Sequence, residues 1–171
     1  MMGSNRPART MAELEFGFEG TDYGMRQMLW TGKMLSTPGW FYWEPQLAAP
    51  VRIEPWIRNS LIESFLNNAR RLAWFLKGAD HNDAYAGDYL PSWPERSEVG
   101  RIIGQVSVAL SHARYKGKPG PYKFRSIADP IANGMLDFTF SLEAIGSTWH
   151  ERFQPLEGLI ETVLPDIRDL A

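Results

Sequence analysis

The sequence predicts an all-α protein, an antiparallel bundle of four to five helices accompanied by a short N-terminal β segment. Apolar residues recur at three- and four-residue steps along several stretches, which is the repeat of an amphipathic helix. Proline and glycine stand at the ends of these stretches, and short connections between long helices favour antiparallel neighbours. The 171 residues are 44% hydrophobic and 22% charged, so residues 11–171 can form a single helical domain with its own core.

The N-terminal region is expected to begin with an unstructured stretch. Residues 1–10 are small and polar, as in a disordered tail or a tag remnant. Residues 11–19 alternate loosely between apolar and acidic side chains, which favours a short strand or an ordered arm. The first helix is expected to start with Thr21 as its N-cap and to run to about Leu35, before Pro38 stops it.

Four prolines make a long helix over residues 37–55 unexpected. The same stretch holds four consecutive aromatic residues, Trp40 to Trp43. They indicate a loop that packs across the bundle, with an exposed recognition patch as the alternative reading.

The clearest helix is predicted over residues 55–78, because Pro55 suits a first helical turn and Gly78 suits a C-terminal stop. A loop over 78–94 is expected to lead into a second amphipathic helix that runs from about residue 94 to Tyr115. The glycines and prolines of 116–121 break this helix.

The remaining pattern predicts two more helices. Asp129-Pro130 suits the cap and first turn of a helix that would continue to about Trp149. A final helix is expected to begin at Pro155, with Pro165 kinking it or ending it early.

Several function classes are excluded by composition and motif. The chain has no cysteine, so it has no disulfide framework, thiol nucleophile or thiolate zinc site. It also lacks a Gly-rich phosphate loop, a G-x-S-x-G elbow and an H-E-x-x-H motif, and its three histidines match no metal template. We therefore expect no cofactor and no metal. No apolar run is long enough to span a membrane, so a cytoplasmic protein without a membrane partner is expected.

One segment is locally basic although the net charge is −2. No acidic residue occurs between Val99 and Ala128, and cations alternate with aromatic residues toward the end of this segment. Cations contact phosphates and aromatic rings stack on unpaired bases, so the pattern indicates a site for single-stranded RNA. The alternatives are a solvated basic loop and a loop that pairs with the acidic C-terminal helix. The expected nucleic-acid-binding residues are Arg114, Tyr115, Lys116, Lys118, Tyr122, Lys123 and Arg125.

Two further sets of residues are candidates for a site. Asn68 and His112 border the apolar stripes of the two central helices, so they are expected to form a polar pair in the groove between these helices, as a register-fixing contact or as part of a catalytic site. An apolar pocket for a small molecule is the other candidate. It would be lined by Trp30, Trp40, Trp43, Trp74 and Trp93.

Residues 56–116 resemble a group of small bacterial helical proteins similar to the HEPN superfamily. The resemblance lies in Ser64–Leu72, in Asp88-Tyr89-Leu90 with Trp93, and in Leu110-Ser111-His112. It implies a helical bundle, commonly dimeric, of a kind that often binds or cleaves RNA in toxin–antitoxin and phage-defence systems. The superfamily's catalytic arginine and histidine lie a few residues apart. Here the arginine that precedes His112 is the more distant Arg101, and Asn68 stands where related proteins often have histidine.

These observations favour a non-catalytic binding or interaction module, RNA-associated and homodimeric or bound to a protein partner. One alternative is a metal-independent ribonuclease that uses His112 and Arg114. Another alternative is a small-molecule binder with the tryptophan-lined pocket.

Overall fold

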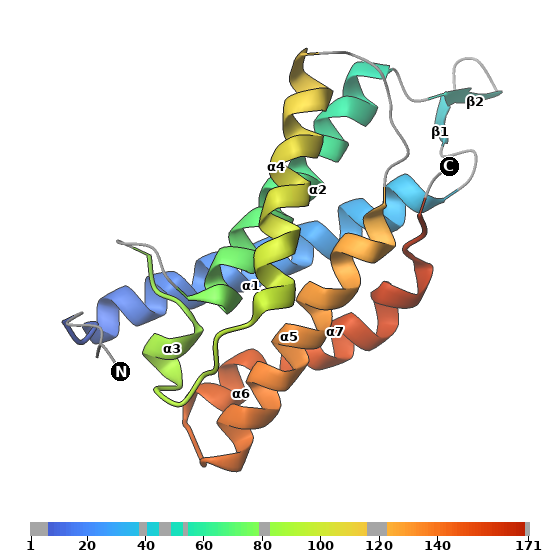
Figure 1. Cartoon of the computed structure of the whole chain (residues 1–171). Helices are drawn as coiled ribbons and strands as arrows, with labels where there is room; N and C mark the ends of the chain where they lie inside the picture. Colours follow the sequence, from blue (N-terminus) through green and yellow to red (C-terminus); the bar gives the residue numbers. More distant parts are fainter. Residues whose placement is uncertain are drawn as a thin grey trace.

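The computed structural model describes residues 7–37, 41–44, 49–52, 55–78, 83–115 and 123–169, and their side chains outside 41–56 and 111–115. Helices make up most of this part of the chain, so the all-α prediction is confirmed (Figure 1). The helices are α1 (Met11–Ser36), α2 (Pro55–Lys77), α3 (Ala86–Tyr89), α4 (Ser97–Tyr115), α5 (Phe124–Ala144), α6 (Trp149–Phe153) and α7 (Pro155–Val163), followed by the 3-10 turn η1 (Leu164–Asp166). None of these helices combines the length and the apolar composition that a membrane span requires.

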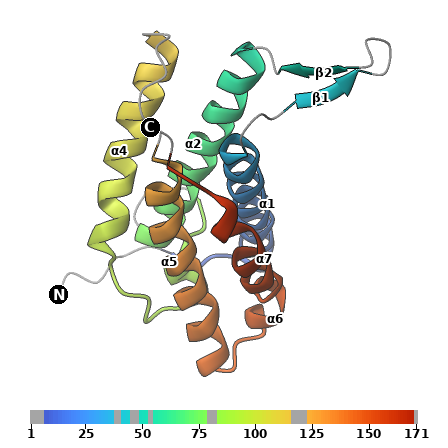
Figure 2. The same cartoon turned by 90° about the vertical axis from the view of Figure 1, so that its right-hand side faces the viewer.

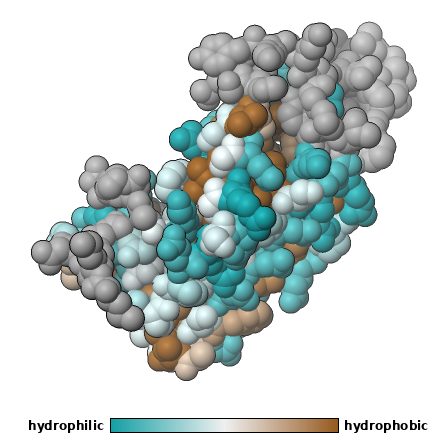
Figure 3. Space-filling view, in the orientation of Figure 1, coloured by the Kyte–Doolittle hydropathy of each residue, from teal (hydrophilic) through white to brown (hydrophobic). Residues whose placement is uncertain are grey.

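The long helices are arranged around α2. Figure 2 shows α2 between α4 on one side and α1 on the other, with α5 and α7 packed beside them. Helices α2 and α4 lie side by side and run in opposite directions (Figure 1). The face formed by α4 and α5 is mainly hydrophilic, with smaller apolar patches in its upper and middle parts and at the end where α5 meets α6 (Figure 3).

A short antiparallel hairpin replaces part of the loop expected over residues 37–55. Strand β1 (Phe41–Glu44) pairs with β2 (Ala49–Arg52), and Trp43 stands opposite Pro50 in the ladder. The residues between the two strands lie outside the described part of the chain, and the recognition-patch reading of this region stays a prediction.

The expected strand over residues 11–19 is wrong, because α1 begins at Met11. Thr10 is its N-cap: the Thr10 hydroxyl accepts from the Glu13 N–H at 3.2 Å, and the Glu13 carboxylate accepts from the Thr10 N–H at 2.7 Å. This reciprocal capping box satisfies amide groups that a helix start leaves unpaired. Arg9 pairs with Glu13 and Asp88, whereas residues 1–6 of the expected tail lie outside the described residues.

The predicted helix over 55–78 is confirmed as α2, and its inner residues form the centre of the hydrophobic core. Phe65, Leu72 and Leu76 are fully buried because α2 is covered on two sides. Gly78 follows the last helical residue with a φ of 63°, a left-handed conformation that glycine adopts without strain.

The close approach of α1 to its neighbours depends on glycines along its inner side. A Cβ at Gly32 would lie 2.9 Å from Ile167 Cδ1 and 3.0 Å from Phe65 Cε2. A Cβ at Gly17 would lie 2.5 Å from Ala84 Cβ and 2.7 Å from the Tyr89 hydroxyl. Because these positions are glycines, the backbone of α1 can pack closely against its neighbours in the core.

The helix expected from Asp129 to Trp149 differs at both ends. Helix α5 begins at Phe124, so Pro130 lies inside it rather than in its first turn. An interior proline removes one helical hydrogen bond, but burial of the residues on both sides of Pro130 holds the helix together. The helix ends at Ala144 because Gly146 turns the chain with a φ of 66°, and Trp149 begins the separate helix α6.

The C-terminal prediction is confirmed. Helix α7 begins at Pro155 and gives way to the turn η1 at Leu164, next to Pro165. A proline at the first helical position is favourable, whereas one near the end cannot continue the hydrogen-bond ladder.

An aromatic cluster joins the lower ends of the helices in Figure 1. Phe75, Tyr89, Phe138 and Phe153 meet mostly edge to face, with ring centroids 5.0 to 6.3 Å apart. The Tyr89 hydroxyl donates to the Leu14 carbonyl at 2.6 Å, and burial raises the pKa of this phenol. The loop that carries α3 is thereby fixed to the start of α1.

Alanine substitutions at two glycines of α1 distinguish the effect of close packing on stability from the effect of helix propensity. Gly24→Ala is expected to raise the free energy of unfolding by about 0.5–1 kcal/mol, because a new Cβ meets its neighbours at 3.6 to 3.7 Å and alanine favours the helix. Gly17→Ala should instead lower it by about 1–3 kcal/mol through collision with Ala84 and Tyr89. Urea unfolding followed by circular dichroism measures both, and a shift in the same direction for the two variants contradicts this packing.

Candidate functional site

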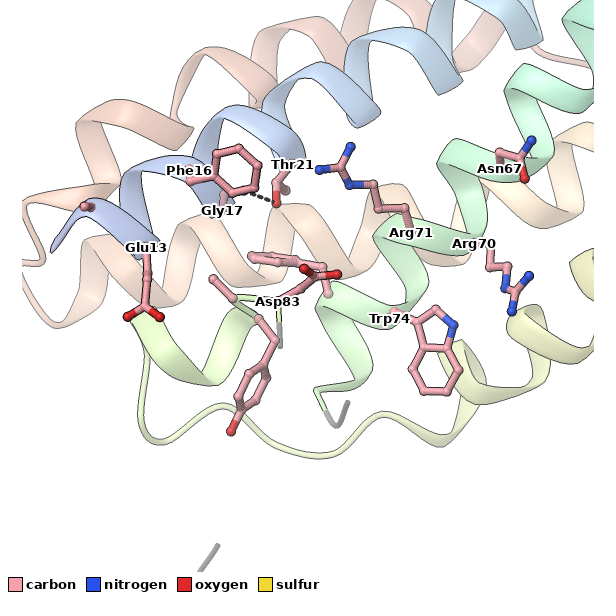
Figure 4. Close-up of a pocket in the computed structure, with 13 residues that line it drawn as sticks. Glu13, Phe16, Gly17, Thr21, Asn67, Arg70, Arg71, Trp74 and Asp83 are labelled. Carbon is pink, nitrogen blue, oxygen red and sulfur yellow. Dashed lines mark hydrogen bonds between the residues drawn. The ribbon is translucent and has the colours of Figure 1, made fainter. Parts of the chain in front are cut away.

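A groove lies between the first half of α1, the last half of α2 and residues 83–85 (Figure 4). Its volume is about 770 Å³, within the range typical of ligand pockets. Gly17, Thr21 and Phe75 are among its least exposed lining residues, and Phe16, Asn67 and Trp74 are among the more exposed ones. The groove therefore combines apolar and polar surface from two helices and one loop.

The α2 wall of the groove carries two arginines. Asn67, Arg70, Arg71 and Trp74 recur at three- and four-residue steps, so the helical repeat brings them to one side of α2. Within the described residues, neither guanidinium has an ion pair or a side-chain hydrogen bond. Both are exposed, so they can take up an anionic group without breaking an existing contact.

Arg71 extends from α2 toward α1 (Figure 4). Its guanidinium lies where a side chain at position 20 would begin: a Cβ on Gly20 would be 3.0 Å from the Arg71 Cζ. The Thr21 hydroxyl beside it donates to the Gly17 carbonyl at 2.8 Å. A glycine at position 20 thus opens the space that Arg71 occupies across the groove.

Two carboxylates also line the groove: Glu13 lies at one end of it, and Asp83 lies between Glu13 and the α2 arginines (Figure 4). Glu13 is committed to the α1 cap: backbone and side-chain hydrogen bonds with Thr10, together with Arg9, hold the pKa of the Glu13 carboxyl below its usual value. Arg9 also donates to the Asp83 carbonyl at 3.3 Å. Arg9 thus pairs with the Glu13 carboxylate and contacts the Asp83 backbone, and the two arginines of α2 add positive charge to the α2 wall of the groove.

Aromatic rings border the arginines. Phe16 is 71% exposed, and Trp74 is half-buried with the Lys77 ammonium 5.2 Å from its ring centroid. The Tyr85 ring lies against Gly78, where a Cβ would be in collision with it. Guanidinium groups beside exposed ring faces can bind a ligand that carries both an anionic group and a planar aromatic group.

The structure describes only part of the basic segment that is predicted to bind nucleic acid. Lys116, Lys118 and Tyr122 lie outside the described residues, and Arg114 and Tyr115 are placed only as the last residues of α4. Lys123 is exposed at the start of α5. The prediction that this segment binds RNA stays untested.

Arg125 connects α5 to the C-terminal segment. Its Nε donates to Asp129 at 2.6 Å, and its Nη1 donates to the Leu164 carbonyl at 2.8 Å. Asp169 accepts from the Ser126 hydroxyl at 2.6 Å and from the Ser126 N–H at 3.1 Å. Arg125 thus pairs with an acidic residue of its own helix, and the alternative in which the basic loop pairs with the acidic C-terminal helix stays a prediction.

Of the predicted polar pair of Asn68 and His112, the structure describes the side chain of Asn68. The Asn68 amide donates to the Ser64 carbonyl at 2.8 Å, and its oxygen lies beside Gly24 of α1. His112 belongs to α4, but its side chain is outside the described part, so the pair stays a prediction. No three His, Cys, Asp or Glu side chains in the described ranges are grouped closely enough to hold a metal ion.

Of the five tryptophans expected to line one pocket, Trp74 lines this groove. Trp93 belongs to the core, where its indole N–H donates to the Leu76 carbonyl at 2.7 Å, and Trp30 is on the outer side of α1. Trp43 is in β1, and Trp40 lies outside the described residues. The expectation of a pocket shared by these tryptophans is therefore wrong for Trp30 and Trp93, because Trp30 lies on the outer side of α1 and Trp93 packs against the core.

Sequence reasoning missed Arg70 and Arg71 as candidate site residues. Their spacing with Asn67 and Trp74 was a usable signal, but it resembles any solvated helix face until α1 and residues 83–85 are seen beside it. Comparison of the chain with family models, with curated proteins and with solved structures finds no match. The site must therefore be interpreted from its own geometry.

The Asp169–Ser126 contact predicts a pH-dependent contribution to stability. Partial burial alone would raise the pKa of the Asp169 carboxyl, but the Ser126 hydrogen bonds, the Arg125 N–H and Lys123 outweigh it, so the net shift is downward. A lowered pKa in the folded state means that the contribution is present above the unfolded pKa of roughly 4 and is lost as the pH falls through the folded value.

Asp169→Asn is therefore expected to lower the free energy of unfolding by about 1 kcal/mol or less near pH 7, with the difference shrinking on acidification. Urea unfolding at a series of pH values measures this difference. Ser126→Ala is the matched control, since it removes one side-chain donor from the same contact. In the double variant, Ser126→Ala should cause little further loss of unfolding free energy beyond that of Asp169→Asn. A difference that stays constant below pH 4 contradicts the assignment.

Proposed function

We propose that this chain is a non-catalytic binding module for single-stranded RNA, and that the groove between α1 and α2 is its binding surface. The observation that carries the proposal is the pair of guanidinium groups, Arg70 and Arg71, without ion pairs in the described part of the chain, in a groove that the half-buried ring of Trp74 and the exposed ring of Phe16 also line. An antiparallel bundle of four to five helices would serve as the rigid support for this surface.

The chemistry of RNA suits this arrangement. Phosphate oxygens accept from guanidinium groups, and unpaired bases stack on aromatic rings with little dependence on sequence. The arginines and Trp74 lie within two turns of one helix, so a short run of nucleotides can contact all of them. A duplex keeps its bases stacked inside and offers only its backbone, so the rings favour a single strand.

The groove and the basic segment 114–125 are separate regions. Figure 1 places the C-terminal end of α4 at the far end of the α2–α4 pair from residues 83–85, which form one wall of the groove. A cytoplasmic role in bacterial defence or in a toxin–antitoxin pair belongs to the same proposal, and it rests on the resemblance of residues 56–116.

Binding of a fluorescently labelled single-stranded RNA, measured by anisotropy, tests the proposal. Trp74→Ala should weaken binding about 5- to 150-fold, because one stacked base is worth about 1–3 kcal/mol. Arg70→Ala and Arg71→Ala should each reduce the slope of log affinity against log salt by about 0.7, as expected for one lost phosphate contact on a single strand.

Arg58→Ala is the matched control, since it removes the same charge from an exposed position of α2 about 18 Å from Arg70. Equal losses for Arg58 and Arg70 would show non-specific attraction and would contradict the groove. Loss confined to variants of 114–125 would move the site to that segment. RNA cleavage that disappears in His112→Ala would replace the proposal with the ribonuclease alternative.

A further inference from the structure

Helix α1 presents a row of aromatic side chains on the side that faces away from the core. Phe16, Tyr23 and Trp30 are 71%, 58% and 45% exposed, and they follow one another at intervals of seven residues. Seven residues are nearly two helical turns, so the three rings lie along one face. Figure 2 shows α1 at the edge of the molecule, with α2 on its inner side.

This exposed row is not explained by the packing of α1 in the core. The inner side of α1 is complete without it: Met25, Met28 and Leu29 are fully buried there, and Gly32 is in contact with Phe65 and Ile167. A large aromatic side chain covers roughly 150–250 Å² when buried, so the three rings leave on the order of 350 Å² exposed. This area is within the range of the largest apolar patches on protein surfaces, which are often functional.

The charges of α1 are segregated along its length. All four of its carboxylates lie in the first half, at Glu13, Glu15, Glu19 and Asp22, and its two cations lie in the second half, at Arg26 and Lys33. Two copies of α1 packed in parallel would place like charges together. Two copies packed antiparallel place the acidic half of each against the basic half of the other.

We propose that a second copy of this chain covers the outer face of α1, with the two α1 helices antiparallel about a twofold axis near Tyr23. In this register Phe16 of each copy lies opposite Trp30 of the other, and the two Tyr23 rings meet at the axis. Glu19, which is exposed and has Arg152 of its own chain as an electrostatic neighbour, comes within reach of Arg26 of the other copy. Arg26 already pairs with Asp22 of its own chain at 3.0 Å, and its remaining N–H groups can donate to this second carboxylate.

The expected interface is small, as in complexes that associate weakly. Phe16 and Trp30 are separated by fourteen residues, or about 21 Å of helix, and a seven-residue repeat over this length supports packing of side chains between two helices. The rings of both copies together bury on the order of 700 Å², and the helix flanks bring the total near the lower end of specific interfaces, roughly 1,200 Å². A dimer that dissociates at micromolar concentrations is therefore expected.

Sedimentation velocity over about 1 to 100 μM protein tests this proposal on the full chain. The wild-type chain should change from monomer to dimer across this range. Tyr23→Lys and Trp30→Lys in one chain should remain monomeric throughout, with an unchanged circular dichroism spectrum because both positions are exposed. Phe16 is left intact because it also lines the RNA groove, so the outcome does not depend on the proposed function. The control is a chain with Phe140→Lys and Ile145→Lys, which loses two exposed apolar side chains at the end of α5. This control variant should still dimerise.

Charge exchange tests the antiparallel register separately. Glu19→Lys and Arg26→Glu alone should each weaken dimerisation about tenfold or more, and the two substitutions in one chain should restore it. A parallel pairing would leave the single variants unaffected, because position 19 would then face position 19 of the other copy. A wild-type chain that is monomeric at every concentration, or a dimer that survives the Tyr23 and Trp30 substitutions, overturns the proposal.

Discussion

The close contact between α1 and α2 is the constraint on which the rest of this structure depends. Glycines on the inner side of α1 let its backbone approach α2 and the loop of α3 more closely than any side chain would allow. Because α4 covers the opposite side of α2, this contact leaves α2 enclosed between two helices, and its fully buried residues form the centre of the core. The free energy gained by burying them supports helices that are too short to be stable alone.

The same contact produces both surfaces to which we assign a role. Helices α1 and α2, together with residues 83–85, enclose the groove. Because position 20 is a glycine, the Arg71 side chain has room to extend across the groove toward α1. The inner side of α1 is filled mainly by small residues, methionines and Leu29, and three of its aromatic side chains, Phe16, Tyr23 and Trp30, are left on the outside. An RNA-binding groove and a dimer interface therefore share one helix, with Phe16 at the boundary between them.

The sequence was sufficient where local signals decide the structure and insufficient where distant residues do. Pro55 and Gly78 marked the ends of α2, and Pro155 and Pro165 marked those of α7. The start of α1 was missed because loose alternation outweighed the capping box of Thr10 and Glu13, which was visible in the sequence. Pro130 was misplaced because burial on both sides stabilises α5 around it. The groove needed α1, α2 and residues 83–85 together, so no local pattern could have placed Arg71 beside Gly20.

The central claim is that Arg70, Arg71 and Trp74 contact RNA, and side-chain nitrogen resonances measure this most directly. Single-stranded RNA added to 15N-labelled protein should shift the Nε signals of Arg70 and Arg71 and the indole signal of Trp74. The corresponding signals of Arg125 and Trp93 should stay in place, because their N–H groups already donate to Asp129 and to the Leu76 carbonyl. Shifts confined to residues 114–125, or no shift at any of these groups, would contradict the account.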